Sequence, residues 1–522
     1  MTTPTLPAEP PAPDWRIWVG FAAMAVGNFM SILDIQIVAS SIREIQAGVA
    51  ASAEELIWIQ TSYLVAEVIA IPLSGFLGRA LSIRNLYTIG ALGFSLASAA
   101  CAFAWSIESL IVFRAIQGFM GGALIPTTLA TVFLLFPPKN RPTVQVMIGL
   151  IVTLAPSIGP TVGGLITDSL GWRWLFLINL VPGVIAAGLV YAFIRVGKPN
   201  YGLLARMDWA GLIGLALFLG ALQFVLEEGP RQGWLASGDI ALWGMVAAGA
   251  GAVFFWRAFS APEPVVSLRA FSDRNFAIGS AISLVLGLGL YGAVYLQPLF
   301  LGGVLGYSAL QIGHVMFVTG ATMFLSAPIA RLFAMSIDPR LAVGIGVIAV
   351  AMGCLLQANL TAQSGFWDFF LPQVLRGFGF IFCFITVTNL ALGTLPASEV
   401  QNASGVFNLT RNLGGAIGLA ALNTARDWST AFHKTELAPM LDPANPLVRQ
   451  HLAESAAALQ AAGVADPERA AIAQYASLLS REATIMAFNS LFFAMSVAFL
   501  AILLMLPLLK KPQLAQATDA GH

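Results

Sequence analysis

Residues 152–164 read Val-Thr-Leu-Ala-Pro-Ser-Ile-Gly-Pro-Thr-Val-Gly-Gly, two prolines and three glycines inside a long apolar segment. In a bilayer such a segment stays helical, because no water is available to satisfy free backbone groups. Proline bends a helix, and glycine lets a neighbouring helix approach closely. We therefore expect a bent, tightly packed membrane helix that forms part of a gate, although packing alone is an alternative interpretation. The candidate gating residues are Pro156, Gly159, Pro160, Gly163 and Gly164.

The composition of the whole chain supports a membrane location for this stretch. Of 522 residues, 58% are hydrophobic and only 10% are charged, and the mean hydropathy is +0.81. Soluble domains have about 25% charged residues, so we expect an all-α integral membrane protein. The formal net charge of zero argues against nucleic acid as a partner. The three cysteines are far apart in apolar segments and predict neither a disulfide framework nor a metal site.

A hydropathy window of about 20 residues predicts fourteen transmembrane helices. The predicted spans are 17–41, 56–78, 86–105, 108–135, 143–167, 173–194, 209–226, 239–258, 276–299, 310–333, 341–360, 368–394, 402–424 and 485–508. Lysine and arginine concentrate in the loops on the side of the N-terminus, whereas the short loops on the other side hold only Arg43, Arg173 and Arg231. This bias places both termini in the cytoplasm.

A weak internal repeat divides the spans into two groups of six. Gln117-Gly118-Phe119 in the fourth span and Arg376-Gly377-Phe378 in the twelfth are each followed by a proline at the inner end and then by a glycine-rich span. We predict six-helix bundles at 15–200 and 273–510, joined by an inserted helix pair at 201–272. Residues 1–14 and 511–522 are predicted to be cytoplasmic tails, the first of them disordered and without the features of a signal peptide.

One outer loop, residues 425–484, is long, polar and rich in alanine. Asn445-Pro446 and Asp466-Pro467-Glu468 have the pattern of a helix cap followed by proline, and Gly463 is suited to a helix end. We expect two helices outside the membrane, the second continuing into the last span. A solvated spacer and a docking surface are both compatible with the length of this loop.

Five ionisable side chains fall in the middle of predicted spans: Asp34, Glu67, Arg114, Arg376 and Arg411. Each costs about 2.5–3.5 kcal/mol on insertion scales, so each is a functional candidate. Counted along helices with a rise of about 1.5 Å per residue, Asp34 and Arg114 lie at one depth and Glu67 about one turn deeper. We expect the two acids to load and release protons beside Arg114. A purely structural ion pair is the alternative for Asp34 and Arg114.

Four motifs, in order and at matching spacing, carry a resemblance to a known family. They are Leu33-Asp34-Ile35-Gln36-Ile37-Val38, Arg114-Ala115-Ile116-Gln117-Gly118, Gly159-Pro160-Thr161-Val162-Gly163-Gly164, and Gly171-Trp172-Arg173-Trp174 followed by Phe176, Asn179 and Pro182. Over residues 15–510 the chain resembles the fourteen-helix drug:proton antiporters of the major facilitator superfamily, and within them the EmrB multidrug exporters. The loop after the second span departs from the pattern: it keeps Gly75 and Arg84, but Arg79 and Ser82 replace the family's aspartate and second glycine.

The resemblance implies a major facilitator fold and proton-coupled efflux of lipophilic or amphiphilic drugs across the bacterial inner membrane. It also implies a periplasmic adaptor of the EmrA type and an outer-membrane channel of the TolC type as partners. The proton gradient would replace any cofactor. An exporter of one metabolite or siderophore and a proton-coupled importer are alternatives. An enzyme or a primary pump is not favoured, because the sequence has no HExxH, GxSxG or GxxxxGK[ST] motif.

The substrate cavity of such a transporter is expected to be large and mostly apolar, with a few polar groups. Aromatic, methionine and polar side chains on the inward spans are its candidate lining. They are Phe29, Met30, Gln36, Tyr63, Gln117, Tyr291, Tyr295, Arg376, Phe384, Phe407, Asn408 and Arg411.

Overall fold

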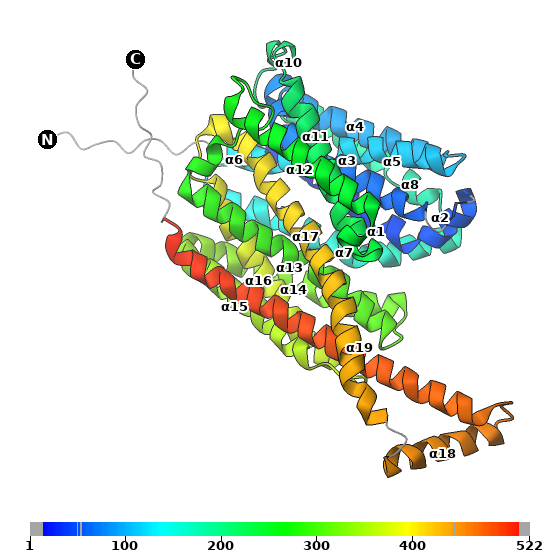
Figure 1. Cartoon of the computed structure of the whole chain (residues 1–522). Helices are drawn as coiled ribbons and strands as arrows, with labels where there is room; N and C mark the ends of the chain where they lie inside the picture. Colours follow the sequence, from blue (N-terminus) through cyan, green and yellow to red (C-terminus); the bar gives the residue numbers. More distant parts are fainter. Residues whose placement is uncertain (1–13, 50, 53–54, 442–444, 511–522) are drawn as a thin grey trace.

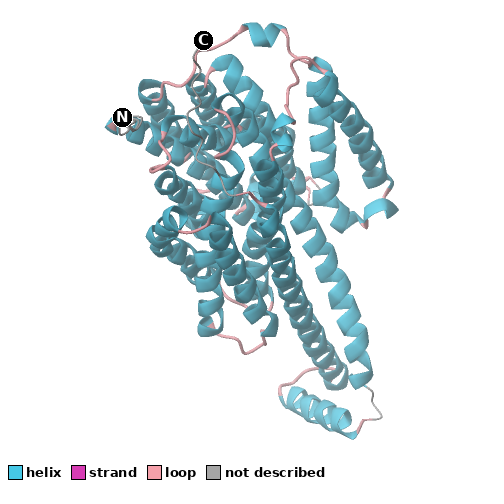
Figure 2. Cartoon of the chain, turned by 90° about the vertical axis from the view of Figure 1, so that its left-hand side faces the viewer, coloured by secondary structure: helices cyan, strands magenta, loops and turns pink. Residues whose placement is uncertain are grey.

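The computed structural model describes residues 14–49, 51–52, 55–441 and 445–510. Within these ranges the regular structure is entirely helical (Figures 1 and 2). Each of the fourteen predicted spans coincides with a helix or a pair of consecutive helices. Twelve helical segments of the described residues are long and apolar enough to cross a membrane, and α7 and α17 are not among them. The all-helical fold is therefore established, and the count of fourteen spans and the cytoplasmic termini remain predictions.

The first half comprises six long helical units and one short helix, α2. They are α1 (Trp15–Ser40), α2 (Ile42–Val49), α3 (Leu56–Leu81), α4 (Ile83–Ala102), α5 (Ile107–Gly122) with α6 (Leu124–Leu135), α7 (Arg141–Leu170), and α8 (Trp174–Leu177) with α9 (Leu180–Phe193). The predicted fourth span is interrupted at Ala123, three residues before Pro126. Proline cannot donate the backbone hydrogen bond that a continuous helix requires, which accounts for the interruption.

The inserted pair follows the short helix α10 (Gly202–Ala205). It consists of α11 (Trp209–Gln232) and α12 (Gly238–Ser260), connected through η1 (Trp234–Ala236). A partly buried ion pair joins the two helices, with Arg257 Nη2 2.9 Å from Asp208 Oδ1. α11 packs against α3 of the first half and α17 of the second, so the insertion covers one side of the seam between the halves (Figure 1).

The second half begins after η2 (Arg269–Ser272). Its helices are α13 (Arg274–Gly303), α14 (Ala309–Ser336), α15 (Pro339–Leu356) with η3 (Gln357–Asn359), α16 (Phe366–Leu392), α17 (Ala397–Leu437) with η4 (Ala438–Leu441), α18 (Pro446–Ala461), and α19 (Pro467–Ala501) with η5 (Ile502–Leu508). The halves meet where α3 packs against α17 and α7 against α14. At the first contact, a Cβ added to Gly75 would lie 2.7 Å from Asn402 Cα, so glycine permits the approach of the two backbones.

The long outer loop is helical where it is described. α17 continues to Leu437, and α19 begins at Pro467, so both project beyond the bundle and carry α18 at the tip (Figures 1 and 2). The predicted helix starts are confirmed: the side chain of Asn445 accepts a hydrogen bond from Leu447 N and that of Asp466 from Arg469 N. Gly463 has a φ of +78°, as expected at a helix end.

Candidate functional site

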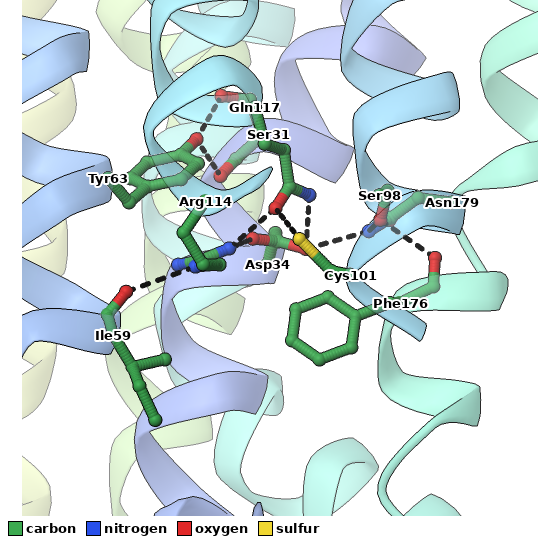
Figure 3. A network of polar contacts seen from close by, with 10 residues as sticks. All are labelled: Ser31, Asp34, Ile59, Tyr63, Ser98, Cys101, Arg114, Gln117, Phe176 and Asn179. Atoms are coloured by element: carbon green, nitrogen blue, oxygen red, sulfur yellow. Dashed lines mark hydrogen bonds and ion pairs between the residues drawn. The ribbon is translucent and has the colours of Figure 1, made fainter. Parts of the chain in front are cut away.

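Asp34 and Arg114 form an ion pair in the interior of the first half (Figure 3). Besides Arg114, the carboxylate of Asp34 accepts hydrogen bonds from Gln117 Nε2 at 3.0 Å and Asn179 Nδ2 at 2.8 Å. Arg114 also donates from Nε to the carbonyl oxygen of Ile59, and its guanidinium lies 4.3 Å from the ring centroid of Tyr63. Asp34 thus has three side-chain partners, one of which is a cation.

Asn179, the partner of Asp34 that is most distant from it in the sequence, is positioned by a break in its helix. The predicted sixth span divides into α8 and α9 at residues 178–179, and Pro182 follows. Proline at this position cannot bond to the carbonyl of Ile178, so the helix restarts at Leu180 with Asn179 at the junction. From there the Asn179 amide donates to both Asp34 and Ser98 Oγ, the latter at 3.1 Å. The proline therefore explains why an asparagine side chain reaches the acid.

The two candidate proton carriers differ in their surroundings. Asp34 and Arg114 are both 0% exposed, so the pair is enclosed within the first half. Glu67 on α3 is 8% exposed, and among the described residues neither a hydrogen bond nor an ion pair engages its carboxyl group. It lies within electrostatic range of Arg114 and Asp34. In this conformation Asp34 is therefore enclosed, and Glu67 is the more exposed of the two acids.

A second buried polar cluster occupies the corresponding place in the other half. Arg376 on α16 is 1% exposed and donates from Nη1 to Gln357 Oε1 at 2.9 Å and from Nη2 to Gln373 Oε1. Thr319 Oγ1 donates to the same Gln373 oxygen at 2.7 Å, and Gln357 donates to Gln297. Within the described part of the chain no carboxylate pairs with Arg376. Its partners are neutral amides.

Equivalent glycines show that the two clusters correspond. A Cβ on Gly118 would lie 2.2 Å from the carbonyl oxygen of Tyr63, and one on Gly377 would lie 2.4 Å from that of Thr319. α5 therefore approaches α3 as α16 approaches α14, and the Gly-Phe repeat read from the sequence is a structural repeat. In this alignment Arg376 corresponds to Gln117, and Gln373 to Arg114.

A largely apolar pocket lies between α7 and the helices of the second half. Arg411 is its one charged lining residue among those described, and its guanidinium lies 5.3 Å from the Phe384 ring centroid and donates to Asn408 Oδ1. Asn408 Nδ2 is buried without a hydrogen-bond partner. The pocket is lined by Gly149, Ser283, Leu286, Leu290, Met323, Phe380, Phe384, Val387, Thr388, Phe407 and Arg411.

Only part of the predicted cavity lining meets at this pocket. Phe384, Phe407 and Arg411 line it, and Asn408 adjoins it. Tyr63 and Gln117 belong to the Asp34 cluster, and Arg376 to the cluster of the second half. The rest lie elsewhere. Phe29 and Met30 pack in apolar clusters of the first half, Gln36 contacts Gly159, Tyr291 bonds to Asn412, and Tyr295 bonds to Asn423.

The proposed gate helix, α7, runs without interruption from Arg141 to Leu170. A Cβ on Gly159 would lie 2.4 Å from Gln36 Cβ, so this glycine allows α1 and α7 to approach as expected. Gly163 is buried, whereas a Cβ on Gly164 would meet nothing within 4 Å. The side chains of Pro156 and Pro160 fall outside those described.

The loop after α3 forms a contact that differs from the expected motif. Arg79, at the position of the family's aspartate, lies 4.0 Å from Glu263 in the segment after α12. Gly75 packs on Asn402, whose amide donates to the Ser267 carbonyl of the same segment at 2.6 Å. Arg84 instead lies over the ring of Tyr191, 4.7 Å from its centroid. The inserted segment thus contacts both halves at this end of the bundle.

Sequence reasoning named Gln117 but gave no site role to most of the other neutral members of the two clusters. Asn179, Ser98, Gln357, Gln373 and Gln297 carry no charge, so they were not among the buried ionisable side chains that the sequence singles out. A usable signal existed for Asn179, which precedes Pro182 by three residues inside an apolar span.

Comparisons with known proteins agree with the fold. The family model described as Major Facilitator Superfamily matches residues 24–419. The chain is 46% identical to the "Colistin resistance protein EmrB" of Acinetobacter baumannii, over 86% of this chain and 89% of that protein. It is 30% identical to the "Multidrug export protein EmrB" of Escherichia coli, over 96% of each chain. The solved structure of the human organic anion transporter MFSD10 has a TM-score of 0.59 at 14% identity, with 95% of this chain and 100% of that chain covered.

Proposed function

The chain belongs to the EmrB-type branch of the Major Facilitator Superfamily, and from this premise we propose that it is a multidrug efflux antiporter driven by protons. Membership in this family makes it a multi-pass membrane transporter and not an enzyme. The observation that carries the proton coupling is the Asp34–Arg114 pair, a titratable acid bound to a fixed cation in the interior of one half.

Protonation of Asp34 is the step that changes this cluster. Arginine stays charged in proteins, so the pair can change its charge only at the carboxylate. A proton on Asp34 removes the negative partner of Arg114 and weakens the hydrogen bonds from Gln117 and Asn179. Those partners lie on α5 and at the start of α9, and Arg114 also bonds to α3 through Ile59. Loss of the charge therefore loosens three helices at once.

Glu67 supplies a second acid nearer the seam. It carries no bonded partner, keeps slight exposure and lies on α3, which packs against α17 of the other half. In our proposal a proton enters through Glu67 when the transporter opens outward, reaches Asp34, and leaves to the cytoplasm after the halves rock inward. Each elementary charge that crosses the membrane contributes about 2.3 kcal/mol per 100 mV.

The pocket around Arg411 is the proposed substrate site. Its apolar lining suits lipophilic compounds, and a small number of polar groups orients them. Proton loading of the first half would change the contact of α7 with α16, because Gly149 of α7 lines the same pocket. The substrate would then leave towards the outside.

The helical projection of α17, α18 and α19 is the proposed docking surface for a periplasmic adaptor of the EmrA type, which would connect the transporter to a TolC-type channel. Large apolar side chains stand exposed on it, including Trp428 at 76% and Ile472 at 59%. This assignment requires that the protein lies in the bacterial inner membrane with both termini in the cytoplasm. In that orientation the projection extends into the periplasm.

Efflux by everted vesicles tests the proposal. We expect Asp34→Asn and Glu67→Gln, compared with wild type at matched expression, to abolish or strongly reduce dye-dependent dissipation of a pH gradient. Glu108→Gln, which alters an exposed acid at the start of α5, serves as the matched control and should transport. Normal proton-driven transport by both acid variants would overturn the assignment of these residues.

A further inference from the structure

A second pocket, outside the central one, lies at the end of the bundle from which the projection extends. Its walls come from the start of α3, the end of α11 and the start of α12. Trp58, Thr61, Phe224, Glu228, Arg231 and Asp239 are among its lining residues. Two of the three walls are the inserted helices, for which the proposed transport cycle has no role.

Two neighbouring acids at this pocket each have one carboxylate oxygen without a hydrogen bond. Glu228 is 4% exposed, and Arg231 Nε, Arg231 Nη2 and Gln232 Nε2 all donate to its Oε2, which leaves Oε1 without a hydrogen bond. The neighbouring Glu227 lies beside Thr61, and its Oε2 is buried without a partner. Unfilled carboxylate oxygens require a ligand that brings N–H donors and positive charge.

Thr61 comes from another helix, α3, and lies beside Glu227. Its side chain is 0% exposed, lines the pocket and has no hydrogen-bond partner for Oγ1. An unsatisfied buried hydroxyl costs about 1–3 kcal/mol, and a donor or acceptor of a ligand would remove that cost.

Aromatic rings form the remaining wall. Trp58 and Phe224 are stacked with centroids 5.4 Å apart, and Trp243 lies 5.8 Å from Phe224. Trp58 is 42% exposed and Trp243 is 39% exposed, so their faces are open. Aromatic faces attract cations and also accommodate apolar groups.

Charge favours a cation at this position. The one cationic lining residue, Arg231, has its side chain 55% exposed and already pairs with Glu228. Glu228 and Asp239 are the acidic lining residues, and Asp239 has no cationic partner among the described ion pairs. The local charge is therefore negative, in contrast to the central pocket, where the charged lining residue is Arg411.

We propose that the pocket between α3, α11 and α12 binds an organic ammonium ion that carries an apolar group. The ammonium donates to Glu228 Oε1 and to Thr61, and the apolar group lies against Trp58 and Phe224. The site takes up amphiphilic amines from the outer end of the bundle, and its occupancy does not depend on the transport cycle.

Equilibrium binding of a fluorescent amine tests this site. The probe is dansylcadaverine, an aromatic primary amine, titrated against the full chain in phosphatidylcholine nanodiscs, with protein-free nanodiscs as the baseline. Dansylglycine, which carries the same fluorophore on a carboxylate, is the matched anion. We expect saturable binding of the amine, transfer of excitation from tryptophan to the probe, and no saturable binding of the anion.

Single variants of the lining residues should change the affinity for the amine in opposite directions. Glu228→Gln should weaken amine binding by about tenfold, and Thr61→Val by about threefold. Arg231→Gln removes the competing cation and should tighten binding by about threefold, a gain that damage to the fold cannot produce. Glu436→Gln, on the exposed part of α17, should bind like wild type.

Unchanged affinity in Glu228→Gln, weaker binding in Arg231→Gln, or equal binding of the amine and the anion would each overturn the proposal. Because the readout is binding, it stands or falls separately from the efflux assay of Asp34 and Glu67.

Discussion

Arg114 in the first half and Arg376 in the second are almost equally buried, at 0% and 1% exposure, but among the described residues only Arg114 has a carboxylate beside it. The first cluster is an acid–base pair with neutral helpers, and the second is a lone guanidinium held by glutamine oxygens. A proton can change the charge of the first cluster and not of the second, because arginine does not titrate in proteins. The two clusters therefore share a position and differ in chemistry: the first contains a titratable group, and the second contains only a fixed charge and neutral amides.

Replacing each arginine in turn tests the difference between the two clusters most directly, through the stability that is lost. Arg114→Leu leaves Asp34 buried without a cation, and we expect a loss of about 3–5 kcal/mol in the free energy of unfolding. Arg376→Leu leaves only neutral amides unsatisfied, with an expected loss of about 1–3 kcal/mol. Denaturation in mixed micelles, followed by tryptophan fluorescence, measures both.

A double variant controls this prediction. Asp34→Leu combined with Arg114→Leu should lose less stability than Arg114→Leu alone, because no unpaired charge remains. Equal losses for the two single arginine variants would show that the carboxylate is irrelevant to the stability of the first cluster.

The fold was predictable because long apolar segments leave few choices, and all fourteen predicted ranges are helical. The interruptions at Ala123 and before Leu180 were not predicted, although Pro126 and Pro182 are their physical cause. The Asp34–Arg114 pair followed from depth alone. The cavity lining did not follow, because a helix that is apolar on every side gives no signal of which face turns inward, and Tyr63 and Met30 turned into the first half.

Gly118 and Gly377 test the feature that the two halves share, which is the close approach of two helices at an equivalent glycine. Gly118→Ala and Gly377→Ala should each cost about 2–3 kcal/mol, because the added methyl group would meet a backbone carbonyl that cannot rotate away. The measurement is again denaturation in mixed micelles. Gly164→Ala is the matched control, since a Cβ there meets nothing within 4 Å and the variant should be at least as stable as wild type. A large loss in only one half would contradict the structural equivalence of the clusters.

Adding one acid to each cluster should change stability in opposite directions. Gln373→Glu gives Arg376 a charged partner where Nη2 already donates, and we expect a gain of about 1 kcal/mol. Gln117→Glu removes the donor to Asp34 and places a second carboxylate beside it, with an expected loss of about 1–2 kcal/mol. Thermal unfolding of the two single variants at neutral pH measures the signs. A change of the same sign in both variants would contradict the view that Arg376 lacks a charged partner.

The smallest expected effect concerns the loops that follow α3 and α14, which occupy corresponding positions. Ser82 caps α4 with φ 77° and ψ 154°, a conformation that is favourable for glycine and strained for other residues, whereas Asp338 caps α15 at an ordinary φ of −58°. Ser82→Gly should therefore stabilise the protein by about 1 kcal/mol, since the relief of strain exceeds the few tenths lost with the weak cap from Asn85 N. Asp338→Gly should instead destabilise slightly, because it removes the bond to Arg340 N without relieving any strain. Thermal unfolding of both variants decides the matter: a lower melting temperature for Ser82→Gly would mean that the contact of this loop with its surroundings, and not backbone strain, determines the residue at position 82.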